Sequence, residues 1–156
     1  MAKKFKKPQV FRLPSTTDKI EKFINYLMLD GKKNIARKIF QDTLDEIKKN
    51  GHANPLMVRE TAIENVSPQV MVKSKRIGGA VYQVPVEVPT RKRFFYACKW
   101  IIDFSRGKKG TPMYMRLAEE LLAAYAGQWM SVKKKEDVHK MADANKAFAY
   151  LAKYIK

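Results

Sequence analysis

The hydrophobic residues of the first third of the chain repeat with the three- and four-residue spacing of amphipathic helices. A first helix face is formed at positions i, i+3, i+4, i+7 and i+8 by Ile20, Phe23, Ile24, Leu27 and Met28. We expect this helix to begin near residues 15–17. We expect it to end at Gly31, because glycine is the common residue just after a helix.

Two further helices are predicted before residue 67. One is expected over residues 34–49, with Asn50-Gly51 at its end. Its buried side should consist of Ile35, Ile39, Phe40, Leu44 and Ile47. The other should open with Asn54 as N-cap and Pro55 in the first helical position, a combination typical of helix starts.

The hydrophobic period changes to that of a β-strand between residues 70 and 88. This stretch is rich in β-branched and aromatic residues, and only Gly78-Gly79 interrupts it. A glycine pair between two such runs is typical of a two-residue hairpin turn, which needs positive φ at both positions. The sequence therefore predicts a β-hairpin in which Ile77 pairs with Ala80 and Val70 with Glu87.

This register places apolar side chains at the base of the hairpin and polar ones toward its tip. The polar group consists of Lys73, Lys75, Arg76, Tyr82 and Gln83. Strands of this length extend about 25 Å at ~3.3 Å per residue, so a cationic finger suited to insertion along RNA is expected. The alternative is an ordinary solvated edge hairpin whose lysines oppose aggregation. Three cations at the foot, Arg91, Lys92 and Arg93, favour RNA.

Helical spacing returns after the hairpin. From about residue 91, the expected apolar face is formed by Phe94, Phe95, Cys98, Ile101 and Ile102. The stretch 107–110 should end that helix, and Thr111-Pro112 should start another that lasts to about Ala126. A final helix is expected over residues 132–152, with one side made of Val138, Met141, Ala142, Asn145 and Ala149.

Together these elements predict a mainly α-helical single domain over residues 15–156. Its six helices should carry a protruding two-stranded β-hairpin (70–88) between the third and fourth helices. Residues 1–14 contain five cations, two prolines and no acidic residue. Such a segment buries too little apolar surface to fold alone, so we expect a flexible basic arm that orders on its partner.

Charge narrows the class of partner. The 156 residues include 32 basic and 15 acidic ones, a formal net charge of +17. A polyanion is therefore expected, and nucleic acid comes first because neutralised phosphates release counterions. An anionic membrane surface is the alternative, yet no apolar run could span a bilayer, and the lysine-rich start does not lead into a signal segment. The single cysteine suits the cytosol or an organelle matrix.

Basic residues recur in short clusters along the whole chain. Each cluster alone could be a solvated face. Lys133-Lys134-Lys135, however, lies near the start of the last predicted helix, where cations oppose the helix dipole unless an anion is near. We therefore predict RNA contacts at Lys4, Lys6, Lys7, Arg12, Lys32, Lys33, Lys73, Lys75, Arg91, Lys92, Arg93, Lys108, Lys109, Arg116, Lys133, Lys134, Lys135 and Lys146.

The sequence offers little catalytic chemistry. His52 and His139 fall on different elements with no partner at metal-ligand spacing, and both are expected at the surface. Cys98 should be a buried thiol. The adjacent pairs Glu119-Glu120 and Glu136-Asp137 diverge on helices, so they are interpreted as solvated charges rather than as an acid–base pair. No phosphate-binding loop motif is present. We predict no enzyme activity, no cofactor and no metal.

Three segments of the chain carry a resemblance to a known family. The first is the hairpin sequence Val72-Lys73-Ser74-Lys75-Arg76-Ile77-Gly78-Gly79, with Tyr82-Gln83-Val84-Pro85-Val86-Glu87-Val88. The second is Leu29-Asp30-Gly31-Lys32-Lys33, and the third consists of residues 132–142 and 145–149. They are similar to the hairpin, the first loop and the last helix of the bacterial-type small-subunit ribosomal protein seven family. Residues 150–156 and Val88-Pro89-Thr90 depart from the usual pattern.

The resemblance implies a structural protein of cytoplasmic or organellar ribosomes. It implies primary binding to the 3′ major domain of the small-subunit rRNA, initiation of head assembly, and contacts with neighbouring ribosomal proteins. It also implies that the hairpin lies near the exit-site tRNA and the mRNA, through Arg76, Ile77, Gly78, Gly79, Ala80, Val81 and Tyr82.

Two other classes fit the charge. A nucleic-acid-processing enzyme would need convergent carboxylates or a metal site. A DNA-binding architectural protein should show a recognition helix with several base-reading Arg, Asn or Gln residues, and none stands out.

Overall fold

A computed structural model describes residues 17–154 of the chain. The predicted basic arm over residues 1–14 lies outside the described residues. So do four of the predicted RNA contacts: Lys4, Lys6, Lys7 and Arg12.

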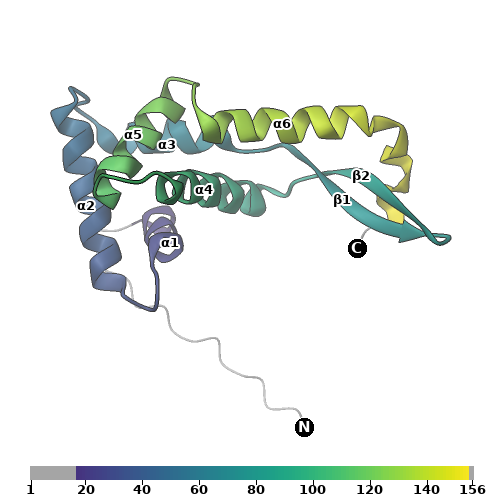
Figure 1. The fold of residues 1–156 in the computed structure, drawn as a ribbon, viewed down its shortest axis with the longest axis horizontal. Coiled ribbons are helices and arrows are strands. Elements are labelled where there is room, and N and C mark those ends of the chain that lie inside the picture. Colours follow the sequence, from purple (N-terminus) through teal and green to yellow (C-terminus); the bar gives the residue numbers. More distant parts are fainter. Residues whose placement is uncertain (1–16, 155–156) are drawn as a thin grey trace, which may run out of the picture.

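Along residues 17–154, three helices precede one β-hairpin and the remaining helices follow it, in the order that the sequence predicts (Figure 1). Before the hairpin lie α1 (Asp18–Leu27), α2 (Lys33–Lys49) and α3 (Pro55–Val66). The hairpin consists of β1 (Val70–Ile77) and β2 (Ala80–Glu87). After it come α4 (Thr90–Gly107), α5 (Met113–Tyr125), α6 (Met130–Ala144) and a 3₁₀ helix, η1 (Lys146–Tyr154). The predicted mainly helical class, with the hairpin between the third and fourth helices, is confirmed.

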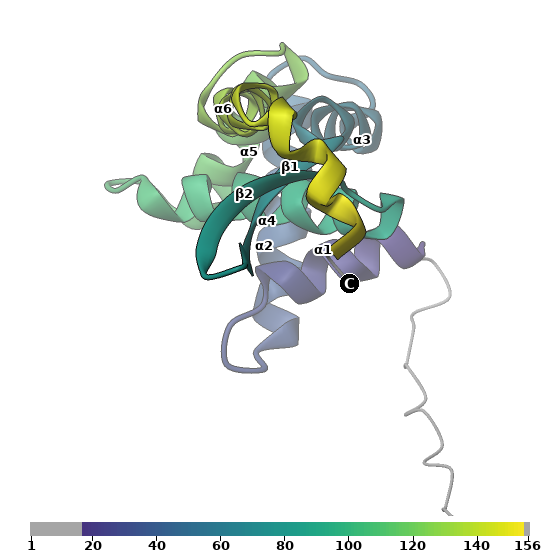
Figure 2. The same ribbon diagram turned by 90° about the vertical axis from the view of Figure 1, so that its right-hand side faces the viewer.

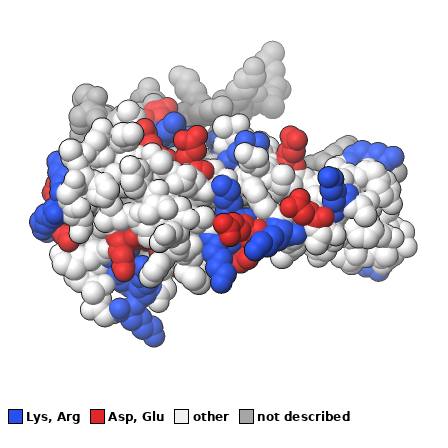
Figure 3. All heavy atoms as spheres, turned by 90° about the horizontal axis from the view of Figure 1, so that it is seen from above, with Lys and Arg blue, Asp and Glu red and all other residues white. Residues whose placement is uncertain are grey.

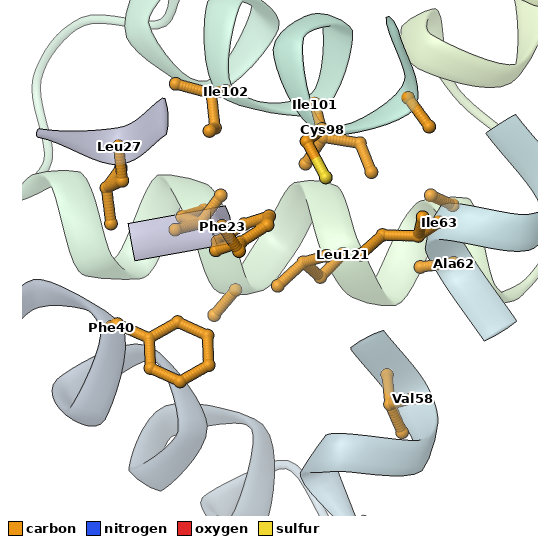
Figure 4. Close-up of a cluster of buried hydrophobic side chains, with 14 of the residues drawn as sticks. Phe23, Leu27, Phe40, Val58, Ala62, Ile63, Cys98, Ile101, Ile102 and Leu121 are labelled. Atoms are coloured by element: carbon orange, nitrogen blue, oxygen red, sulfur yellow. The ribbon is translucent and has the colours of Figure 1, made fainter. Parts of the chain in front are cut away.

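The hydrophobic core lies among the first five α-helices. Figure 4 shows side chains from all five converging on α5. Fully buried members include Phe23 of α1, Ile47 of α2, Ala62 of α3, Ile101 of α4 and Leu121 of α5. Because α5 packs against α2, α3 and α4, it is the centre of the helical body. The rings of Phe23 and Phe40 lie 5.6 Å apart between centroids and join α1 to α2.

Some predicted details of the helices are wrong. Helix α1 ends at Leu27 rather than at Gly31, which instead forms a left-handed turn with Asp30 (φ of 71° and 51°). Ile35 was expected to be buried but is 56% exposed, because the buried stripe of α2 runs through Ala36, Phe40, Thr43, Leu44 and Ile47. Met141 is likewise 54% exposed, since α6 turns Ala142 inward instead.

The hairpin has the predicted register throughout. Val70 pairs with Glu87 and Ile77 with Ala80, and Gly78 and Gly79 have φ of 56° and 88°. Both values lie in the left-handed region that this tight turn demands. Figure 1 shows the hairpin projecting from the helical body, with α6 running from the body toward it.

The last helical segment differs from the prediction. Instead of one helix over 132–152, α6 ends at Ala144 and the chain continues as η1 beside β2 (Figure 2). A 3₁₀ helix has three residues per turn, so Phe148 and Leu151 share one face. Leu151 is buried, and the Phe148 ring lies 5.4 Å from that of Tyr82. The hairpin is thus supported along part of its length rather than free beyond its base.

Candidate RNA interface

Basic side chains are spread over both the body and the hairpin end of the molecule. Figure 3 shows them on the face seen from above, with acidic side chains between them in the middle. A uniformly positive surface is therefore not present on this face. Which cations are available for a partner depends on the intramolecular contacts that each one makes.

Helix α6 carries the lysine triplet. Lys133 and Lys134 are exposed, whereas Lys135 is half-buried and donates a 2.8 Å hydrogen bond to the carbonyl of Asn65 at the end of α3. Because α6 begins at Met130, the triplet starts at the fourth helical residue rather than in the first turn. Repulsion by the helix dipole is weaker there than the sequence suggested. Lys133 and Lys134 are the members free to contact phosphates.

The loop between α4 and α5 holds a second cluster. Lys109 is exposed. Lys108 is engaged on three sides: its Nζ lies 2.9 Å from Glu119, 3.5 Å from Glu120 and 4.8 Å from the centre of the Trp129 ring. Arg116 donates to the carbonyls of Arg106 and Lys108. Lys108 and Arg116 therefore organise this loop, and Lys109 is its available cation.

Glu120 corrects the interpretation that its pair with Glu119 is solvated. Glu119 is exposed, but Glu120 is fully buried. It falls three residues after Leu117 and one before Leu121, on the inner face of α5. Its Oε1 accepts from the hydroxyl of Ser131 at 2.8 Å. The carboxylate thus joins α5 to the first turn of α6.

Two predicted RNA contacts, Lys32 and Lys33, lie where the loop between α1 and α2 meets α2, and their surroundings differ. Lys32 is well exposed and lies 3.8 Å from Asp30. Lys33 instead lies 2.8 Å from the buried carboxylate of Glu21, which also faces Arg37 at 3.4 Å. The hydrogen bond from Lys33, together with both positive charges, holds the pKa of Glu21 below its ordinary value, although burial acts in the opposite direction.

Acid should therefore weaken the fold through Glu21. A carboxyl whose pKa is lower in the folded state stabilises the protein above its unfolded pKa, and this contribution is lost as the pH falls below about 4.5. We expect Glu21→Gln to be less stable than the unmodified protein at pH 7, with the difference narrowing as pH falls below 4.5. Urea denaturation at a series of pH values measures this. A difference independent of pH would contradict the assignment.

The hairpin presents its cations to solvent. Lys73, Lys75 and Arg76 are exposed, and the Arg76 Nε donates to the Gly79 carbonyl at 3.3 Å. At the foot, Arg91 and Lys92 are exposed. Arg93, by contrast, is half-buried and donates a 2.6 Å bond to the carbonyl of Val88, which fixes the junction of hairpin and α4.

The residues expected near tRNA and mRNA also differ in their exposure to solvent. Gly78, Gly79, Ala80 and Val81 are exposed at the tip, and Ile77 is half-buried. Tyr82 is also half-buried, because its ring packs against Phe148. Lys146 is exposed at the start of η1. The exposed cations thus lie on the hairpin and at its foot, on α6 and at the start of η1, with Lys32 and Lys109 on separate loops.

A cavity of about 460 Å³ lies where α3, α4 and α6 meet the hairpin foot. Cations and carboxylates both line it, including Arg59, Glu60, Glu64, Arg93 and Lys135. Arg59 is only 1% exposed and donates to Glu60 at 3.2 Å, and burial lowers its pKa. This burial has no local signal in the sequence, since an isolated arginine on an amphipathic helix is normally solvated.

The histidines and the cysteine have no catalytic arrangement. The buried Cys98 thiol has a pKa raised by desolvation to about 12, as expected for an unreactive thiol. His139, expected at the surface, is half-buried and accepts a 3.1 Å bond from the Gln69 N–H. Within residues 17–154, no group of three or more His, Cys, Asp or Glu side chains could hold a metal ion. Every helix in that range is too short or too polar to span a lipid bilayer.

The comparisons with known proteins agree on one family. The family described as Ribosomal protein S7p/S5e matches residues 2–146. Small ribosomal subunit protein uS7 of Pseudothermotoga lettingae is 51% identical over 132 residues, 85% of each chain. The proteins of the same name from Francisella philomiragia and Leptospira biflexa are 52% identical over 132 residues and 48% identical over 138 residues, covering 84% and 88% of each chain. The family match ends where η1 begins.

Proposed function

Because the chain belongs to the ribosomal protein S7p/S5e family, we propose that it binds rRNA as a structural constituent of the small ribosomal subunit. Membership of this family means that the chain is a component of the small ribosomal subunit and takes part in translation. It also confirms the prediction that the chain is not an enzyme, since proteins of this family are structural. The partners that follow are small-subunit rRNA and neighbouring ribosomal proteins.

The finer proposal is primary binding to the 3′ major domain of the small-subunit rRNA and initiation of head assembly. The observation that supports it best is the set of exposed cations on α6 and at the hairpin foot: Lys133, Lys134, Arg91 and Lys92. Because α6 runs from the body toward the hairpin (Figure 1), these cations can follow one RNA backbone across both parts. Lys32 and Lys109 would add contacts from the two loops.

We further propose roles for the hairpin tip and for the basic arm. The exposed hairpin tip, residues 76–81, reaches away from the body and would lie beside the exit-site tRNA and the mRNA. The basic arm over residues 1–14 would order on rRNA, because its charge needs phosphate neutralisation and its apolar content is too low for independent folding.

The direct test is a binding titration with a transcript of the rRNA 3′ major domain. We expect tight binding that resists a duplex DNA competitor and weakens steeply as salt rises. A transcript of another rRNA domain, matched in length, serves as control. Equal competition by DNA would favour the architectural DNA-binding class and overturn the proposal.

The hairpin tip should be dispensable for folding and for primary rRNA binding. Replacing residues 76–81 by Asn-Gly joins Lys75 directly to a two-residue turn and Tyr82, so the contact of Tyr82 with Phe148 is kept. We expect an unchanged thermal midpoint and unchanged incorporation into small subunits. What should change is exit-site tRNA occupancy or reading-frame maintenance in ribosomes that carry the shortened hairpin.

Tyr82→Ala is the matched comparison, because it keeps the tip but removes the aromatic contact with η1. It should lower the thermal midpoint while leaving the tip sequence in place. If the shortened chain fails to assemble, the tip is itself a primary rRNA contact. If assembly and exit-site behaviour are both normal, the tip has no role at the exit site.

A further inference from the structure

Trp129, in the short segment between α5 and α6, has a backbone conformation that does not suit tryptophan. Its φ is 84° and its ψ is −179°, a region populated essentially by glycine alone. It is also 50% exposed, so burial of the indole does not explain the strained backbone. Strained residues of this kind concentrate at ligand-binding positions.

The indole lies at a hollow with cationic walls. A cavity of about 430 Å³ is lined by Trp129, Met130, Lys133 and Lys140, with Glu136 between the two lysines. Lys133 and Lys140 are separated by seven residues of α6 and therefore lie on one side of the helix. The Lys108 ammonium lies 4.8 Å from the ring centre but is paired with Glu119 and Glu120. The aromatic surface thus lies next to two lysines that are available to an anion, Lys133 and Lys140.

An unpaired nucleotide fits this combination. RNA-binding proteins stack splayed bases on aromatic rings and hold the adjoining phosphates with cations, and such stacking tolerates any base. Resting on the proposed RNA-binding function, we propose that the hollow stacks an unpaired nucleobase on Trp129 while Lys133 and Lys140 bind phosphates of the same strand. Glu136 lies between these lysines, where it can accept from a base amino group.

Replacing Trp129 by glycine separates stability from binding. Glycine adopts the same φ and ψ without strain, which offsets the loss of the contact with Lys108. The variant should therefore keep its thermal midpoint, yet bind the 3′ major domain transcript about 5- to 100-fold more weakly. Tyr150→Ala is the matched control. It removes an aromatic side chain that is 67% exposed in η1, beyond the other end of α6, and it should bind normally.

Fluorescence reports the stacking directly. The chain has two tryptophans, so Trp100→Phe leaves Trp129 as the only indole. We expect its emission to be quenched by the transcript, which has unpaired bases, and to change little on adding a fully paired RNA duplex.

The outcomes are distinct. If the unmodified protein does not bind the transcript, the proposed function fails. If it binds but Trp129→Gly binds equally well, or the duplex quenches as strongly, the stacking site is overturned. A large fall in the thermal midpoint of Trp129→Gly would assign Trp129 to the fold instead. Quenching that requires other ribosomal proteins rather than RNA would assign the hollow to a protein partner.

Discussion

Replacing Glu120 by alanine should lower the free energy of unfolding by about 2 to 3 kcal/mol. The change removes the acceptor for the Ser131 hydroxyl and leaves that buried group without its bond. It also removes a carboxylate 3.5 Å from Lys108. The loss stays below the range for fully buried ion pairs, because Lys108 is 24% exposed and can be hydrated. Urea denaturation measures the effect.

Glu119→Ala provides the control for Glu120. Glu119 is the adjacent residue and pairs with the same lysine, at 2.9 Å, but it is 61% exposed. Exposed pairs contribute little, so its removal should cost less than about 1 kcal/mol. Similar losses in the two variants would mean that Glu120 does not anchor α6 to α5. Glu120→Gln, which keeps an acceptor for Ser131, should fall between them.

Removing Lys133 and Lys134 together should weaken binding to the 3′ major domain transcript about 20-fold near 0.15 M salt. Each lost phosphate contact reduces the slope of log affinity against log salt by about 0.7 to 0.9, so the double variant should lose about 1.4 to 1.8. Lys135→Ala should change the slope less, because its ammonium already donates to Asn65. The measurement is a titration at several salt concentrations.

The pair Lys48 and Lys49 at the end of α2 is the matched control. Both are exposed and their removal changes the net charge equally, but they lie outside the predicted contacts. If both double variants lose the same slope, overall charge rather than a site on α6 governs binding.

The parts of the fold that the sequence predicted correctly are those with strong local signals. The Gly78-Gly79 turn admits one tight register, so every strand pair followed from it. The Asn54-Pro55 start of α3 was equally clear, and Asn54 does accept from the Met57 N–H. Cys98 was predicted to be buried because it shares the helical spacing of Ile101 and Ile102.

The rest depended on contacts between distant segments. Glu120 lies on the same helix face as Leu117 and Leu121, so the spacing was a usable local signal, but its partner Ser131 comes from α6 and could not be predicted. Nine residues of η1 are too few to separate a period of 3.0 from 3.6. The strained backbone of Trp129 was not predicted, because this conformation is not encoded in residue type. A tryptophan just after Gly127-Gln128, at the predicted break between two helices, was the available signal.

The contact between Tyr82 and Phe148 changes how the hairpin responds to force. A two-stranded ribbon that is held only at its base can bend along its whole length, because two strands alone are only marginally stable. Here η1 provides a second support along β2, and Leu151 packs in the same element. Bending of the hairpin is then confined to the residues of its tip, between Lys75 and Tyr82. A force applied at the tip would be passed through η1 to α6, which η1 also contacts.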